Sequence, residues 1–276
     1  MAANQKEMSF LNHLEELRWH MVRSVAAIFI LAIVFFIFAQ QVYDNFLLAH
    51  IHPDFITYQI FCDFFNLFGF DSAFCDINFA EKKLQSIKVT SQLMNSIWSS
   101  LILGLILAFP YLLWEIWRFV SPGLTNKEIK KSRGFIFIAS ALFFIGVLFS
   151  FYVIAPISIH FLYNYQITDS IENSFTLESH IGLVTNMLIG VSILFELPVL
   201  IYFLTKIGLI TPEFLKRYRK HALVVVLILA AIITPPDVAS QVIVAIPILI
   251  LYEIGIKVSK RVIRNQQKNA NKSPRV

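Results

Sequence analysis

The chain alternates between long apolar runs and short polar segments. Six runs carry almost no charge, and they cover residues 22–39, 94–117, 135–162, 180–205, 221–234 and 238–256. A helix needs about 20 apolar residues to cross a hydrocarbon core of about 30 Å, because each residue rises about 1.5 Å. The pattern therefore predicts an all-α membrane protein with six transmembrane helices.

The first run, 22–39, is also where a removable signal peptide would lie. It is about 18 residues long, which exceeds a typical signal-peptide core, and no small-x-small cleavage site accompanies it. We therefore expect this run to be retained as the first span.

Basic residues alternate between the segments that separate the spans. From the N-terminus to the C-terminus, the counts of Lys and Arg are 3, 3, 5, 0, 5, 0 and 7, which sum to all 23 when Arg23, at the very start of the first run, is counted with the N-terminal segment. The second group of three is spread over the long segment 40–93 beside six acidic residues. Since basic loops stay on the cytoplasmic side, we expect both termini to be cytoplasmic, 40–93 to be periplasmic, and the protein to lie in the cell inner membrane.

Composition supports the membrane class and argues against other classes. Hydrophobic residues make up 57% and charged residues 15%, against roughly 45–50% and about 25% in soluble domains. The net charge of +5 comes from clusters between spans, which fits topology better than nucleic-acid binding. Phosphate-loop, dinucleotide and zinc-protease motifs are missing, and the seven histidines lack metal-ligand spacing. We expect no enzyme activity, no cofactor and no metal.

Prolines interrupt four of the predicted spans, at Pro110, Pro156, Pro198 and Pro247. Each removes a backbone donor and tends to kink its helix, so we expect a curved scaffold with a concave face. The alternative is that these prolines are simply tolerated, as they often are in membrane helices.

The last two spans are short. The fifth has an apolar core of 12 residues, 222–233, which covers roughly 18 Å of a hydrocarbon core of about 30 Å. The sixth opens with polar Ser240 and Gln241 and contains Pro247. A short pair is expected to thin the local bilayer or to draw polar groups inward.

Glu196 is the sharpest single candidate, because it lies within the fourth span in the string Leu-Phe-Glu-Leu-Pro. An ionisable group at that depth is costly unless it is solvated or paired, so it marks a functional site by default. The structural alternative is a neutral side chain bonded to a carbonyl freed by Pro198. Glu115 and Glu253 lie near the cytoplasmic ends of their spans, and we interpret both as interfacial.

Acidic residues stand out on the predicted cytoplasmic face, which carries 20 of the 23 basic residues. The main ones are Glu15, Glu16 and Glu128. Residues 10–18 have apolar positions at helical spacing, which predicts a helix lying on the membrane with Glu15, Glu16 and Arg18 turned away from lipid. This face either meets a partner or is only the solvated side of an anchoring helix.

Cys62 and Cys75 both fall in the predicted periplasmic segment. An oxidising compartment permits a disulfide there, and closing a loop of about 13 residues stabilises it by roughly 3 kcal/mol. The alternative is two free thiols beside Phe-rich packing.

Several strings in the chain together resemble the TatC family over nearly its whole length. They occur in the family's order and at the expected places in the topology. The strings are HLEELR at 13–18, FVSPGL at 119–124 followed by Glu128, GVLF at 146–149 with Pro156, FELP at 195–198, TPPDVASQ at 234–241, and AIP at 245–247 with Tyr252 and Glu253. The chain departs from the family in its longer first outward loop and in Asn126, where a basic residue is common.

The resemblance implies a receptor and not a catalyst. TatC-like proteins bind signal peptides with paired arginines and recruit TatA/TatB-type single-span partners, so that folded proteins cross the membrane on the proton-motive force. By motif match, Glu16, Arg18, Phe119 and Glu128 are the expected signal-peptide residues, and Glu196 with Gln241 the expected intramembrane docking point for a partner helix. Self-association into a larger complex is also expected.

Two other functions compete with this interpretation. A secondary transporter should show internal repeats with interrupted helices, and none is convincing here. A membrane-protein insertase would bind nascent hydrophobic segments without paired arginines. In domain terms we expect one membrane domain over 1–260, containing the long loop 40–93, and a disordered basic tail over 261–276.

Overall fold

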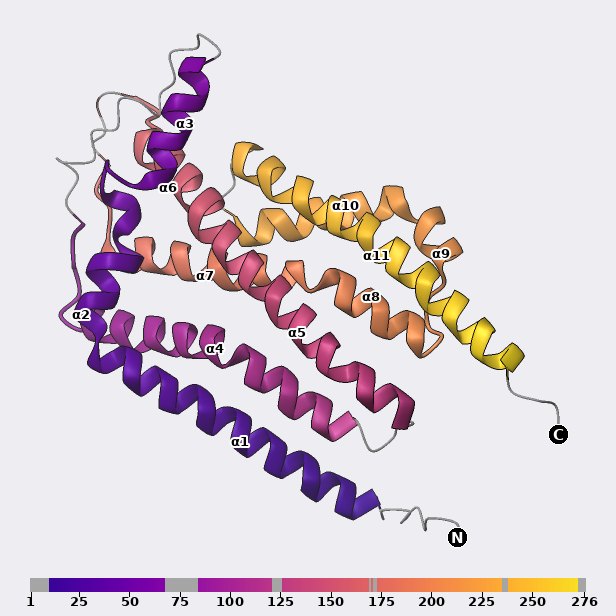
Figure 1. The fold of residues 1–276 in the computed structure, drawn as a ribbon. Helices are drawn as coiled ribbons and strands as arrows, with labels where there is room; N and C mark the ends of the chain where they lie inside the picture. The colour runs from indigo at the N-terminus through magenta and orange to yellow at the C-terminus, as the bar shows by residue number, and fades with distance from the viewer. Residues whose placement is uncertain are drawn as a thin grey trace. The chain divides into compact units, whose positions relative to one another are not determined.

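The computed structural model describes residues 10–67, 84–120, 126–168, 170, 173–234 and 238–272, and these are almost entirely helical. One isolated bridge pairs Gln85 with Thr176, and no strand occurs in the described part of the chain. In chain order, the elements are α1 (Phe10–Ile37), α2 (Ala39–Val42), the π-helical turn η1 (Tyr43–Leu47), the 3-10 turn η2 (Ala49–Ile51), α3 (Ile56–Leu67), α4 (Ser91–Val120), α5 (Asn126–Phe149), the π-helical turn η4 (Ser150–Ile154), α6 (Ala155–Asn164), α7 (Leu177–Phe195), α8 (Leu197–Lys206), α9 (Pro212–Arg217), α10 (Arg219–Ile233) and α11 (Val238–Lys272). Figure 1 shows their course, and the all-α prediction is confirmed.

The described helices include five segments that are long and apolar enough to cross a membrane: 15–37, 91–119, 136–164, 177–206 and 240–268. These correspond to five of the six predicted spans. The remaining prediction, 221–234, falls on α10, which has only 15 residues. The protein is therefore a multi-pass membrane protein, and the count of six spans stays a prediction.

Three boundaries differ from the sequence-based expectation. Residues 10–18 do not form a separate surface helix, because they are the first turns of α1, which continues to Ile37. The helix that contains the sixth predicted span is longer than that span, because α11 runs for 35 residues to Lys272. The expected disordered tail is wrong for 261–272, which are the helical end of α11, while 273–276 lie outside the described residues.

The chain divides into two compact units where one domain was expected. Unit 1 comprises 1–42 and 93–141, and unit 2 comprises 43–92 and 142–276. In unit 1, α1 and α4 run side by side in opposite directions (Figure 1). They approach closely at Gly104, where an added Cβ atom would lie only 2.8 Å from the backbone nitrogen of Ala32 and 2.9 Å from the carbonyl oxygen of Ile28. A side chain at this position would push the helices apart.

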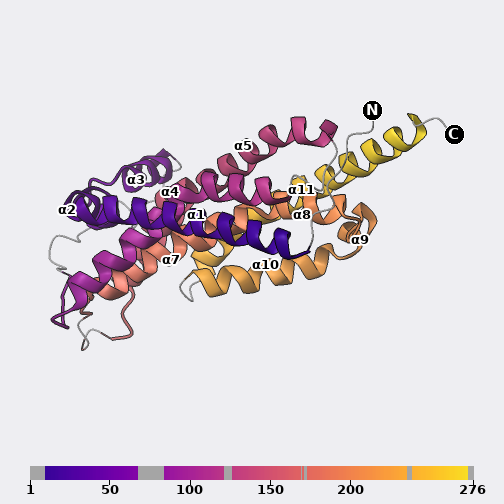
Figure 2. The same cartoon turned by 90° about the horizontal axis from the view of Figure 1, so that it is seen from below.

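In unit 2, α8 and α11 pack along each other. The Thr205 hydroxyl donates to Ser259 at 2.8 Å, and a Cβ atom on Gly255 would collide with Ile201. The short helix α9 makes the turn from α8 to α10 (Figure 2). The Tyr252 hydroxyl fixes this turn, because it donates to the carbonyl of Leu215 at 2.8 Å.

The predicted loop 40–93 contains short helices that pack on η4 and α6 in unit 2. The fully buried His50 ring lies 2.8 Å, through Nε2, from the Phe151 carbonyl, and the Thr57 hydroxyl donates to the Tyr152 carbonyl at 2.6 Å. The Tyr58 hydroxyl donates to the His50 carbonyl at 2.9 Å. Burial disfavours the charged imidazole and lowers the pKa of His50 from 6.5 to about 4.

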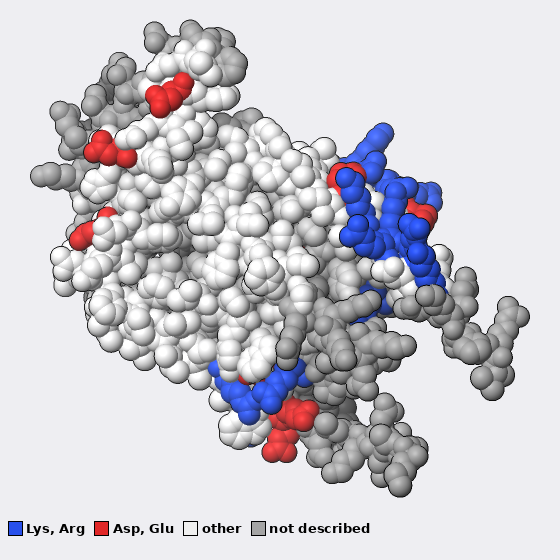
Figure 3. Space-filling model, viewed as in Figure 1, with Lys and Arg blue, Asp and Glu red and all other residues white. Residues whose placement is uncertain are grey.

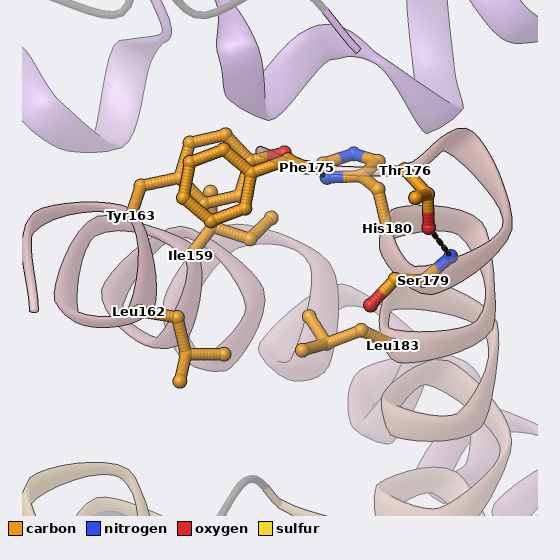
Figure 4. Close-up of a pocket in the computed structure, with 8 residues that line it drawn as sticks. All are labelled: Ile159, Leu162, Tyr163, Phe175, Thr176, Ser179, His180 and Leu183. Carbon is orange, nitrogen blue, oxygen red and sulfur yellow. Dashed lines mark hydrogen bonds between the residues drawn. The ribbon is translucent and has the colours of Figure 1, made fainter. Parts of the chain in front are cut away.

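A small cavity of about 210 Å³ lies at the same end of unit 2, between α6 and α7 (Figure 4). The Tyr163 ring stacks on Phe175 with 3.8 Å between centroids. The Tyr163 hydroxyl lies 3.1 Å from Nδ1 of His180, whose Nε2 lies 3.2 Å from the Leu47 carbonyl. The ring nitrogens of His180 therefore have partners, and they join α6, α7 and η1.

Prolines mark helix breaks at two of the four predicted kinks. Pro156 follows the π-helical turn η4 at the start of α6, and Pro198 opens α8 directly after the chain leaves α7 at Glu196. Pro110 and Pro247 lie inside α4 and α11, which continue through them. The concave scaffold stays a prediction.

Candidate functional site

The predicted signal-peptide residues all belong to unit 1. Glu16 and Arg18 lie in the first turns of α1, where Glu16 is half-buried and Arg18 exposed, and Phe119 is half-buried in the last turn of α4. Glu128 lies in the first turn of α5, but its side chain is outside the described residues. The structure thus places three of these side chains on neighbouring ends of α1 and α4, and pairing of Glu16 with Glu128 stays a prediction.

A buried carboxylate joins the two helices at this end of unit 1. Glu115 of α4 is 1% exposed, and its Oε2 pairs with Nδ1 of His20 from α1, whose side chain is 13% exposed. The Tyr111 hydroxyl donates to Oε1 of Glu115 at 2.7 Å. Both carboxylate oxygens of Glu115 therefore have partners within the protein, and its position at the membrane interface stays a prediction.

Aromatic and basic side chains surround this pair. The His20 ring meets Phe119 edge to face, with 6.1 Å between centroids and an interplanar angle of 66°. The Arg118 guanidinium lies 5.6 Å from the centre of the Trp114 ring, a cation–π geometry. Arg23, one turn beyond His20 on α1, acts electrostatically on Glu115. We call His20, Tyr111 and Glu115 the α1–α4 polar cluster.

Sequence analysis missed this cluster, although a local signal was present. Tyr111 and Glu115 are four residues apart, as are Glu16 and His20, so each pair shares one helix face. His20 and Glu115, however, are 95 residues apart in the chain. Only the antiparallel contact of α1 with α4 shows that the two faces meet.

Glu196 lies at the junction of α7 and α8 in unit 2. Its backbone carbonyl accepts from the amides of Val199 and Leu200 at 2.9 and 3.0 Å. Its side chain is partly buried, and Oε1 has no hydrogen-bond partner among the described residues. Oε1 therefore makes no hydrogen bond to a carbonyl freed by Pro198, and a docking role for Glu196 stays a prediction.

Gln241 has a different environment. Its Nε2 donates to the Leu227 carbonyl at 3.0 Å and so ties α11 to α10. Its neighbour Ser240 is buried and lies 2.6 Å, through its hydroxyl, from the Ser158 hydroxyl of α6. Gln241 therefore contributes to packing within unit 2.

Most of the charged side chains on the visible face of unit 2 lie toward its two ends (Figure 3). Basic residues gather over α9 and the C-terminal part of α11, and acidic ones lie over η1 and α3 in the same view (Figure 3). Glu253 belongs to the basic end, where it pairs with Arg219 at 2.7 Å and is 47% exposed. Its place at the membrane interface stays a prediction.

Cys62 lies on α3 and is disulfide-bonded. Cys75 lies outside the described residues, so the pairing of these two cysteines stays a prediction. In the described part of the chain, no three His, Cys, Asp or Glu side chains are grouped as metal ligands would be.

Long apolar helices with buried polar side chains, such as Glu115 in α4 and Ser240 in α11, define a multi-pass helical membrane protein. Comparison with known proteins gives its family. Residues 12–247 match the model for the Sec-independent protein translocase protein (TatC). A TatC from Blattabacterium sp. subsp. Periplaneta americana is 38% identical over 259 residues, covering 94% of this chain and 97% of the relative.

A second relative and a solved structure agree. The TatC of Carboxydothermus hydrogenoformans is 37% identical over 256 residues, or 92% of this chain and 94% of the relative. A crystal structure of the twin arginine translocase receptor TatC matches with a TM-score of 0.69 at 31% identity, covering 91% of this chain and 99% of that one. The chain belongs to the TatC family.

Proposed function

We propose that this chain is the receptor subunit of a twin-arginine translocase and binds signal peptides of folded precursor proteins. The observation that carries the proposal is the family match over 12–247 together with the site in unit 1. There, Glu16, Arg18 and Phe119 lie on adjoining ends of α1 and α4. The role is binding and recruitment, not catalysis.

The chemistry of this site suits paired arginines. A guanidinium group binds a carboxylate through charge-assisted and often bidentate hydrogen bonds. Glu16 and Glu128 are carboxylates on a face whose other charges are mostly basic. A positively charged peptide therefore binds selectively at these two side chains. Arg18 orients one of them, and Phe119 offers an aromatic surface to apolar residues of the signal peptide.

A partner helix of the TatA/TatB type docks beside Glu196 in this proposal. A carboxyl oxygen without a partner in the hydrocarbon region gains from any donor brought to it. A single-span protein with a polar side chain at matching depth supplies such a donor. Gln241 adds a second polar group to this region of unit 2. Transport then draws on the proton-motive force, as membership of the TatC family implies.

We further propose that the protein lies in the cell inner membrane with both termini in the cytoplasm. The support is the alternation of basic residues between spans and their concentration at one end of unit 2 (Figure 3).

Export in cells tests the function. A strain whose own TatC is deleted should regain export of a folded reporter with a twin-arginine signal peptide when it expresses this chain with its cognate partners. The Lys-Lys signal peptide and an uncoupler should each abolish that export. Uptake of small solutes by proteoliposomes containing this chain alone would instead support a transporter, and cross-linking to nascent spans without paired arginines would support an insertase.

A further inference from the structure

The α1–α4 polar cluster lies one helical turn from the proposed peptide contacts on both helices. On α1, Glu16 precedes His20 by four residues, and on α4, Phe119 follows Glu115 by four. Residues four apart occupy the same face of a helix. Since the helices are antiparallel (Figure 1), both steps lead toward the same end of the pair. His20 also touches Phe119 directly, ring edge to ring face.

Loss of any hydrogen bond to the buried Glu115 carboxylate should cost free energy. A carboxylate that is 1% exposed needs donors for its oxygens, and it receives them from His20 and Tyr111. Removal of His20 would leave one oxygen of Glu115 without its partner, whereas removal of Glu115 would free both helices from a shared anchor. The contact therefore fixes the rotation of α1 relative to α4 at this end of unit 1.

We propose that His20 and Glu115 are positioning residues that set the discrimination of the receptor for arginine over lysine. They hold the first turns of α1, which carry Glu16 and Arg18, in register with the last turn of α4, which carries Phe119. The inference rests on the proposed receptor function. It assigns roles to two residues that do not themselves meet the peptide.

The discrimination follows from the geometry of the two cations. Arginine presents a planar fork of donors that needs a carboxylate in a defined orientation, whereas the lysine ammonium is a point charge that tolerates displacement. If α1 rotates or slides against α4, the bidentate contact with Glu16 is lost and the long-range attraction remains. Loss of the cluster should thus weaken binding of a twin-arginine peptide much more than binding of its Lys-Lys version.

The test measures affinity for both peptides with the full chain in lipid nanodiscs. Wild type should prefer the twin-arginine peptide. His20→Phe removes the bond to Glu115 but keeps a ring beside Phe119, and Glu115→Ala removes the carboxylate. Both should lower twin-arginine affinity about tenfold, the cost of one hydrogen bond to a charged group, and the ratio of the two affinities should fall by a similar factor. Glu115→Gln can still bond to Tyr111 and His20, so it should keep the ratio within about twofold.

The affinity ratio separates positioning from simple damage to the fold. Unfolded protein lowers the apparent affinity for both peptides equally, so it leaves the ratio unchanged. Glu253→Ala is the matched control, because Glu253 is a paired carboxylate in unit 2, and its ratio should equal that of wild type. A full ratio in His20→Phe and Glu115→Ala would overturn the inference. If wild type itself does not prefer the twin-arginine peptide, the proposed receptor function fails instead.

Discussion

At the scale of single residues, most of the candidate chemistry lies in a few carboxylates with contrasting surroundings. Glu115 has partners on both oxygens, whereas Oε1 of Glu196 has none among the described residues. Glu16 is half-buried at the start of α1. A carboxylate paired inside the protein fits a structural role, whereas a buried one that lacks a hydrogen bond is unusual and calls for a specific explanation. This contrast separates the docking and peptide-binding candidates from the positioning ones.

The first prediction concerns Glu16 and Glu128. Replacing both by alanine should reduce binding of a twin-arginine peptide by at least about tenfold, because each charge-assisted hydrogen bond is worth about 1.5–3 kcal/mol. Cross-linking efficiency of a photo-reactive peptide measures the change in membranes where the variant remains inserted. Glu15→Ala is the control and should have a smaller effect, since the family motif falls on Glu16. Unchanged binding in the double variant would refute the assignment.

The second prediction concerns Glu196 as a docking point. Glu196→Gln keeps the size and hydrogen-bonding capacity of the side chain, so it should retain much of the export activity. Glu196→Ala should lose cross-links between α7 or α8 and the partner helix. If Gln abolishes export as fully as Ala while partner cross-links persist in both, a proton-transfer role replaces docking.

The third prediction follows from His50, which is fully buried in unit 2. Its pKa is lowered from 6.5 to about 4, so between these values the unfolded chain binds a proton that the folded chain does not. The free energy of unfolding should therefore fall as the pH drops from 7.5 to 5, by about 2 kcal/mol from this residue.

Thermal unfolding of the protein in detergent at the two pH values measures that loss. His50→Gln cannot titrate but can still donate to the Phe151 carbonyl, so its loss of stability over the same interval should be smaller. An equal loss in the variant would show that other groups cause the acid sensitivity.

At the scale of helices, sequence analysis predicted most elements correctly. Five of the six apolar runs correspond to long helices. They could be predicted because length and apolar composition are enough to recognise a membrane-spanning helix. The ends were less predictable. The mostly polar residues 257–272 continue α11 as a helix. At the other end of the chain, residues 10–18 are the first turns of α1. The helix-face spacing of His20 and of Glu115 is visible in the sequence, but it does not show that these two residues, 95 positions apart, are in contact.

The fourth prediction tests the close contact of α1 with α4. Gly104→Ala places a Cβ atom against the backbone of Ala32 and Ile28, which cannot yield as a flexible side chain does. The expected cost is about 1–3 kcal/mol of stability, measured by thermal unfolding. Gly134→Ala is the control, because nothing lies within 4 Å of its added Cβ atom. Equal stability of the two variants would contradict the observed packing.

At the scale of the whole molecule, the central expectation is a receptor with its peptide-binding face in the cytoplasm. The family follows from similarity along nearly the entire chain. The motif strings predicted it because they occur at expected places in the membrane topology as well as at single sites.

Orientation is the fifth prediction. Reporter fusions after Asp169 should be active outside and those after Lys216 inside, and the reverse pattern would contradict the topology derived from the basic residues.

The most direct measurement is to map where a twin-arginine signal peptide binds. A peptide with a photo-reactive group beside the arginine pair is cross-linked to the full chain in nanodiscs, and the adducts are located by mass spectrometry. We predict adducts in the first turns of α1 and the last turn of α4, near Glu16 and Phe119, with competition by unlabelled twin-arginine peptide and little by its Lys-Lys version. Adducts confined to unit 2, or equal competition by both peptides, would contradict the assignment of this chain as a twin-arginine receptor.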